Sequence, residues 1–124
     1  MKKCLVLNDN NDSRERMRDF LSTYDFEIDL VSDGEEALTL CERNMPDVIV
    51  VDDNMSKMGG LQFLERLSVL RRARYSEEPV ILLCLDSTDV EKMGKALWSG
   101  ATECLMKPFD ADILDFKLQQ SGAI

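Results

Sequence analysis

A chain of 124 residues is long enough for one domain with its own hydrophobic core, and we expect residues 1–124 to form a single domain. Its 24 acidic residues outnumber the 15 basic ones, and the net charge of -9 argues against direct binding to nucleic acid or anionic membranes, which both need a positive field. The 44% of hydrophobic residues is typical of a globular protein. We therefore expect its partners to be proteins.

The start of the chain and its cysteines bear on where the protein works. No apolar run approaches the ~20 residues that a membrane-spanning helix requires. The segment from Met1 to Leu7 resembles the beginning of a signal peptide, but polar residues 8–12 end it too early for export, so we expect a cytoplasmic protein. The absence of histidine and of a CxxC pair argues against zinc, and we interpret the cysteines as small buried hydrophobic residues: Cys4, Cys41, Cys84 and Cys104.

Short apolar runs alternate with helical patterns along the whole chain. They predict strands at residues 4–8, 26–31, 47–52, 80–85 and 103–106. Helices are expected at residues 12–24, in the segment that ends before Met45, around residues 61–70, at 88–99 and at 110–120. Because the third and fourth strands are nearly continuous in Val, Ile and Leu, the pattern favours a parallel sheet that is buried on both faces.

The same pattern predicts how some helices begin, end and face the core. Asp12 and Glu15 have the spacing of a capping box at the start of the first helix. Gly100 suits a left-handed residue at the end of the fourth helix. The apolar residues that we expect to face the core in the first, fourth and fifth helices are Met17, Phe20, Leu21, Leu97, Ile113, Leu114 and Leu118.

Five strand–helix units in succession predict a doubly wound (βα)5 fold of the α/β class. Crossovers between parallel strands are right-handed, so the helices cover both faces of an open sheet, and ligands bind at the carboxyl ends of its strands. Asp9, Asp52 and Lys107 lie at the ends of the first, third and fifth predicted strands. We therefore expect these three residues to meet at one edge of the sheet.

Two carboxylates and an ammonium group at one sheet edge suggest a particular chemistry. Carboxylates that are held close together repel each other unless a cation neutralises them, and Mg²⁺ suits oxygen ligands while leaving positions for phosphate oxygens. Asp52 is then a candidate nucleophile toward a phosphoryl donor, and Lys107 would stabilise the developing charge. The alternative is that Asp9 and Asp52 only cap the segments that follow them. Their combination with Lys107 favours the phosphoryl site.

The motifs are similar, as a set, to those of a known family. Asn8–Asp9, residues 47–60, Ser99–Ala101 and Lys107–Phe109 resemble the CheY-like response-regulator receiver domains of bacteria, and the resemblance covers the whole chain. It implies a flavodoxin-like fold with strand order 2-1-3-4-5. It also implies a stand-alone signalling switch of a two-component system or phosphorelay. Such a switch catalyses only its own phosphorylation and slow dephosphorylation.

The resemblance also implies roles for individual residues. Asp52 would be the phosphoacceptor and, together with Asp9 and the backbone carbonyl of Asn54, a Mg²⁺ ligand. Lys107 would bind the phosphoryl group, and the peptide bond before Pro108 would be cis. A histidine kinase or a phosphotransfer protein would donate the phosphoryl group.

Three residues near the expected site depart from the family pattern. Asn8 replaces the usual first acid, so we expect it to be a weak or indirect metal ligand. Ser56 stands where the family usually has proline, and Gly59 stands where aspartate is frequent. Both changes predict more backbone freedom in the loop after Asp52.

A larger departure concerns the residues that report phosphorylation. Receivers usually have a Ser or Thr at the end of the fourth strand and an aromatic residue in the fifth. Counting forward from Pro79 places the hydroxyl position at Cys84, and counting back from Lys107 places it at Leu85. The aromatic position, three residues before Lys107, is Cys104. None of these residues has the usual group. Ser87 or Thr88 either replaces the hydroxyl or caps the fourth helix.

The resemblance implies that output passes through a docking face made of the fourth helix, the fifth strand and the fifth helix, which changes on phosphorylation. Trp98, in the fourth helix, is either an exposed anchor for a partner or packed against the sheet. Two interpretations of function therefore stand: a receiver that signals after phosphorylation of Asp52, and a degenerate receiver that acts as an adaptor without phosphate. A small phosphatase or flavin carrier fits less well, because no glycine-rich phosphate loop is present. We expect a monomer or a weak dimer.

Overall fold

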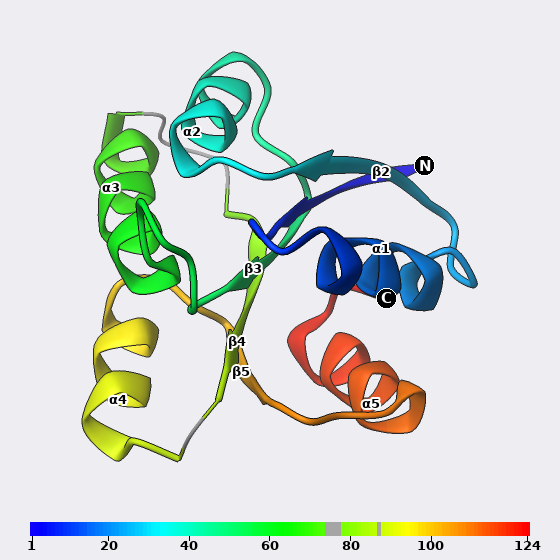
Figure 1. The fold of residues 1–124 in the computed structure, drawn as a ribbon. Coiled ribbons are helices and arrows are strands. Elements are labelled where there is room, and N and C mark those ends of the chain that lie inside the picture. Colours follow the sequence, from blue (N-terminus) through cyan, green and yellow to red (C-terminus); the bar gives the residue numbers. More distant parts are fainter. Residues whose placement is uncertain (74–77, 87) are drawn as a thin grey trace.

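The fold is a parallel sheet whose strands alternate with helices (Figure 1). The computed structural model describes residues 1–73, 78–86 and 88–124. In these residues the elements are β1 (Lys2–Leu7), α1 (Asn11–Leu21), β2 (Phe26–Val31), α2 (Gly34–Arg43), β3 (Val48–Asp52), α3 (Gly60–Ala73), β4 (Val80–Leu85), α4 (Val90–Trp98), β5 (Glu103–Met106) and α5 (Ala111–Ser121). The strand order is β2-β1-β3-β4-β5 with parallel pairing throughout, which confirms the predicted flavodoxin-like fold.

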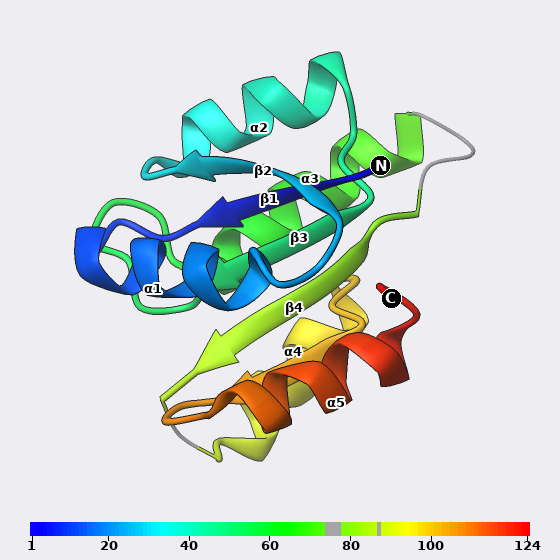
Figure 2. The same cartoon turned by 90° about the vertical axis from the view of Figure 1, so that its right-hand side faces the viewer.

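Helices cover both faces of the sheet. α1 and α5 lie on one face, and α2, α3 and α4 lie on the other (Figures 1 and 2). Successive residues of β3 point to opposite faces: Val48 and Val50 pack on the side of α1 and α5, whereas Ile49 and Val51 pack on the side of α2 and α3. The position of a residue in its strand therefore decides which helices its side chain packs against.

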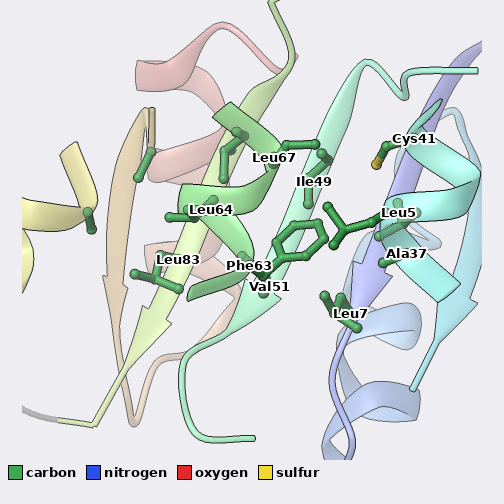
Figure 3. Packing of buried hydrophobic residues seen from close by; sticks show 14 of the residues in the cluster. Leu5, Leu7, Ala37, Cys41, Ile49, Val51, Phe63, Leu64, Leu67 and Leu83 are labelled. Atoms are coloured by element: carbon green, nitrogen blue, oxygen red, sulfur yellow. The ribbon is translucent and has the colours of Figure 1, made fainter. Parts of the chain in front are cut away.

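The larger hydrophobic cluster lies between the sheet and helices α2, α3 and α4. Phe63, Leu64 and Leu67 of α3 meet residues of the central strands such as Ile49 and Leu83 (Figure 3). All five of these side chains are fully buried. This packing fixes the start of α3 against the end of β3, and therefore fixes the loop that follows Asp52.

The observed helix ends correct one prediction and confirm another. Asn10, and not Asp12, caps α1: its side chain accepts a hydrogen bond from the backbone N–H of Ser13. Asp12 lies inside the first turn, where its charge favours the helix N-terminus. Gly100 has a φ of 109°, as predicted for the residue that follows α4. The backbone there adopts a conformation that glycine tolerates best.

Two residues that we predicted to face the core are partly exposed. Leu97 is 52% exposed, and its neighbour Ala96 is the buried residue of α4. Ile113 is 45% exposed, whereas Leu114 and Leu118 bury the inner face of α5. Consecutive residues of a helix point about 100° apart, so an error of one position turns an inward residue outward.

The four cysteines are buried and free, as the sequence predicted. Burial raises the pKa of the Cys4 and Cys41 thiols, to about 12 and about 11 respectively. These thiols therefore stay protonated and behave as small apolar side chains. In the part of the chain that the structure describes, no helix has both the length and the apolar character needed to cross a membrane.

Candidate functional site

The carboxyl ends of β3 and β5 bring Asp52 and Lys107 into contact. Asp52 is the last residue of β3, and Lys107 follows β5 directly. The Lys107 backbone N–H donates to the Leu85 carbonyl at 2.8 Å, which extends the pairing of β5 with β4 by one residue. The Lys107 ammonium then donates to Oδ1 of Asp52 at 2.6 Å. The sequence-based expectation that these two residues meet is thus satisfied.

Asp52 is a buried carboxylate that is 6% exposed. Its second oxygen, Oδ2, accepts a hydrogen bond from the Asn54 backbone N–H at 3.0 Å. Burial raises the pKa of the Asp52 carboxyl, while Lys107 and the Asn54 N–H oppose this effect. The carboxylate is therefore held by two donors but remains costly to keep charged in its buried position.

Lys107 has a second acidic neighbour that the sequence reasoning missed. Oδ1 of Asp86 lies 3.2 Å from the Lys107 ammonium. Burial lowers the pKa of Lys107, but the hydrogen bonds and charges of Asp52 and Asp86 outweigh this effect, so the pKa of Lys107 is raised overall. The signal was present in the sequence, because Asp86 directly follows the apolar run of β4 just as Asp52 ends that of β3.

Asp9 lies at the same edge of the sheet but its carboxylate bonds to another part of the site. Oδ2 of Asp9 accepts hydrogen bonds from the Ser56 backbone N–H at 2.8 Å and from the Ser56 hydroxyl at 3.1 Å. Asn8 is 9% exposed, and its Oδ1 accepts from the Asn10 N–H at 2.9 Å. Among the described residues, no three Asp, Glu, Cys or His side chains are grouped closely enough to hold a metal ion.

A pocket of about 310 Å³ opens beside Asp52. It lies between the ends of the strands, α1 and the segment that leads into α5. Its polar lining residues are Asn8, Ser13, Arg16, Asp52, Asp86 and Lys107, and its apolar lining residues include Val6, Met17, Phe20, Val50, Cys84 and Phe109. The Asp52 carboxylate is therefore accessible to a small group that enters this pocket, although the side chain is largely buried.

The structure separates the two candidates for the missing hydroxyl position. Cys84 is paired with Asp52 in the register of β3 and β4, lines the pocket and packs on the side of α1 and α5. Leu85 and Cys104 pack together in the cluster on the side of α3 and α4. Burial raises the pKa of the Cys84 thiol to about 12, with a further contribution from Asp52. Beside Asp52 there is thus a protonated thiol in place of a hydroxyl.

The remaining predicted residues lie around this edge. The peptide bond between Lys107 and Pro108 is cis. Asp89 caps α4 by accepting from the Lys92 N–H, so Thr88 is not the helix cap, and Ser87 lies outside the described residues. Trp98 is 92% exposed, which decides between the two alternatives for its position.

The response regulator receiver domain family matches residues 4–119. The chain belongs to this family. Receiver domains are signalling switches and not conventional enzymes. The chain is also similar to the response regulator MprA of Mycobacterium sp. (strain KMS), with 33% identity over 107 residues, which are 86% of this chain and 44% of the relative. It therefore spans less than half of the length of that relative.

Solved structures show the same fold. The chemotaxis protein CheY4 of Vibrio cholerae is 30% identical, with a TM-score of 0.85 and 98% of each chain covered. The receiver domain of Ssk1 from Saccharomyces cerevisiae, solved with the histidine phosphotransfer protein Ypd1, has a TM-score of 0.85 over 98% of this chain and 89% of that chain. At 22% identity, the second comparison supports the fold alone.

Proposed function

We propose that this receiver accepts a phosphoryl group on Asp52 and signals through protein contact. The observation that carries the proposal is the buried Asp52 carboxylate, held by the Lys107 ammonium at 2.6 Å and by the Asn54 N–H at 3.0 Å. It faces a pocket that offers room for a phosphoryl group. A role in stability alone does not explain this arrangement, because a buried ion pair rarely stabilises a fold more than well-packed apolar residues of similar volume do.

The proposed reaction is a phosphoryl transfer. An oxygen of Asp52 forms a bond to phosphorus, the bond from phosphorus to the donor atom breaks, and the electron pair of that bond leaves with the donor. The product is an acyl phosphate. The Lys107 ammonium lies close enough to neutralise charge on the phosphoryl oxygens, and the Asn54 N–H keeps the carboxylate oriented. A side chain fixed in this way needs little reorganisation before it attacks.

The residues at the site have the donor chemistry that Mg²⁺ requires. Asp9, Asp52 and the carbonyl of Asn54 all offer hard oxygen ligands. When bound, Mg²⁺ would neutralise negative charge between the carboxylates and the phosphoryl oxygens. Oδ2 of Asp9 accepts both Ser56 donors, so binding of the ion by this oxygen would compete with Ser56. Asn8, an amide, would contribute only weakly or through water.

The family supports the choice of partners. Receiver domains interact with histidine kinases or phosphotransfer proteins, and we infer that one of these donates the phosphoryl group here. For the output we propose the face of α4, β5 and α5. The exposed large apolar side chains of helices α4 and α5 are Val90, Leu97, Trp98, Ile113 and Phe116. Large exposed apolar side chains, tryptophan above all, are frequent anchors of protein interfaces.

One observation favours a second candidate function. The positions that usually report phosphorylation hold Cys84, a buried thiol beside Asp52, and Cys104, which is packed in the apolar cluster on the side of α3 and α4; they provide neither the usual hydroxyl nor the usual aromatic ring. A receiver with this cluster could act as an adaptor whose docking face is already in its binding form. In that case, its output would not require phosphate.

One experiment separates the two candidates. The receiver is titrated with Mg²⁺ and then with beryllofluoride, a phosphoryl mimic, while ¹⁹F NMR reports the bound mimic and Trp98 fluorescence reports α4. Phosphoacceptor function predicts bound fluoride signals in the wild type and none in Asp52→Asn. Their absence from the wild type would favour the adaptor.

A further inference from the structure

A second ion pair joins the loop after β3 to helix α4. The Lys92 ammonium donates to Oδ2 of Asp53 at 2.7 Å. The Asp53 side chain is 14% exposed and that of Lys92 is 40% exposed, so the acid is largely buried and the base covers it from the surface. The hydrogen bond and charge of Asp53 raise the pKa of Lys92, consistent with a charged pair.

Three further hydrogen bonds join Asp53 to two other parts of the molecule. Its Oδ1 accepts from the Leu61 N–H in the first turn of α3 at 3.3 Å. Its backbone N–H donates to the carbonyl of Cys84 at 3.0 Å, and its own carbonyl accepts from the Gly60 N–H at 3.1 Å. One residue, adjacent to Asp52 in the chain, therefore bonds to β4, to the start of α3 and to α4.

The link to α4 is specific to Lys92. Among the described residues, Lys92 is the one side chain of α4 that forms an ion pair with an acid outside its own helix, since Lys95 pairs with Glu91 one turn away. The positions that usually couple a receiver's site to this face are occupied by Cys84 and Cys104, which lack the usual hydroxyl and the usual aromatic ring. A polar connection from the site to α4 therefore runs through Asp53.

We propose that the Asp53–Lys92 ion pair transmits the state of Asp52 to α4. This inference rests on the proposed phosphorylation of Asp52. The Asn54 N–H, which bonds to Asp52, belongs to the peptide group that follows Asp53, so a change in that bond moves the peptide next to the Asp53 side chain. A phosphoryl group on Asp52 also adds a charge of about -1.5 to -2 to the residue that precedes Asp53, and this charge changes the electrostatic field at the ion pair.

The expected consequence is a change at the N-terminal turn of α4. Lys92 lies in the first turn of the helix, and its side chain is tied to the site by a single carboxylate. When the shift of the Asp53–Asn54 peptide changes the position of the Asp53 carboxylate, the ion pair carries this change to the first turn of α4. Asp53 and Lys92 then act as positioning residues, because neither one takes part in the transfer of the phosphoryl group.

The test compares Asp53→Asn and Lys92→Met with Lys95→Met, a control that removes an exposed lysine from the same helix. Each variant is saturated with Mg²⁺ and beryllofluoride. Bound mimic is measured by ¹⁹F NMR, and the response of α4 is measured from its amide shifts and from the Trp98 indole. The inference predicts a bound mimic in all of them, with the α4 response reduced by about threefold or more in the first two variants only.

Lys92→Arg provides the conservative control. It keeps the positive charge, so it should restore most of the α4 response that Lys92→Met loses, whereas a purely structural defect would not follow charge in this way. Because Lys92 is partly exposed, this pair of variants remains informative even if Asp53→Asn fails to fold.

The outcomes are distinct. Bound mimic with an undiminished α4 response in Lys92→Met overturns the inference and leaves the proposed function intact. An equal loss in Lys95→Met also overturns it, because the effect would then not be specific to the ion pair. Absence of bound mimic from the wild type overturns the proposed function and, with it, the inference.

Discussion

The backbone N–H and the hydroxyl of Ser56 both donate to the same oxygen of Asp9, at 2.8 Å and 3.1 Å. Proline, the usual residue of receivers at this position, has neither donor. Ser56 therefore holds the carboxylate that the family uses for metal binding. This bond couples the conformation of the β3–α3 loop to the availability of Asp9.

Ser56→Pro is expected to strengthen Mg²⁺ binding, because it removes both donors that compete for Asp9. The net value of each hydrogen bond is about 0.5–1.5 kcal/mol, which corresponds to an affinity gain of about twofold to tenfold for each donor that is removed. Isothermal titration with Mg²⁺ measures the change. Ser56→Ala, which removes only the hydroxyl, should lie between the wild type and the proline variant, and an unchanged affinity in both would contradict the competition.

Lys107→Met is expected to destabilise the protein on the order of 2 kcal/mol, because it leaves the buried Asp52 carboxylate without its ammonium partner. Urea unfolding measures the free energy. Lys95→Met is the matched control: its pair with Glu91 is exposed, so its loss should stay within about 0.5 kcal/mol. Adding Asp52→Asn to Lys107→Met should recover most of the loss. Equal losses in the two methionine variants would show that burial of the pair does not matter.

The raised pKa of Asp52 predicts a pH dependence of stability. The Asp52 carboxyl binds its proton more tightly in the folded state than in the unfolded state. The free energy of unfolding therefore falls as the pH rises from the ordinary carboxyl pKa of 3.8 through the higher pKa of the folded state. Asp52→Asn should therefore be more stable than the wild type at neutral pH, and the difference should shrink as the pH falls toward 3.8. Urea unfolding across this range measures it. If the wild type is more stable than Asp52→Asn at neutral pH, the predicted direction of this effect is wrong.

Gly60 allows the loop to pass close to the end of β3. A Cβ at this position would lie 2.6 Å from the Asp52 carbonyl oxygen and 2.8 Å from the Asp53 Cα, so the backbone itself would have to move. Gly60→Ala should cost about 1–3 kcal/mol in urea unfolding and displace the amide signal of Asp52. Gly59→Ala is the control, since the nearest contact of a Cβ at this position would be an ordinary 3.4 Å. Similar losses in both variants would mean that the close approach is not the cause.

The fold could be predicted from the sequence because its signals are local and strong. The continuous apolar runs of β3 and β4 and the repeated strand–helix alternation determine a parallel sheet. The contact between Asp52 and Lys107 follows from that topology, since both residues end strands of one sheet. Leu97 shows the limit of the method: a nine-residue helix has too few turns for its apolar pattern to fix its rotation.

The other contacts of the site depend on loops and on the placement of α4. Whether Asp9 turns toward Asp52 or toward Ser56 is a competition between partners, and residue types do not decide it. The pairing of Asp53 with Lys92 joins residues from two elements that meet only in three dimensions. Sequence reasoning identified Asp9 and Asp52 at the strand ends and the contact of Asp52 with Lys107, but it could not assign the partner of Asp9.

The central claim is that Asp52 accepts the phosphoryl group. Its most direct test is incubation of the wild type, Asp52→Asn and Asp53→Asn with radiolabelled acetyl phosphate and Mg²⁺, followed by measurement of the label bound to protein. Asp53→Asn changes the neighbouring carboxylate and leaves the nucleophile in place. We predict label on the wild type and on Asp53→Asn, and none on Asp52→Asn. Equal label on Asp52→Asn, or no label on the wild type, would contradict the claim.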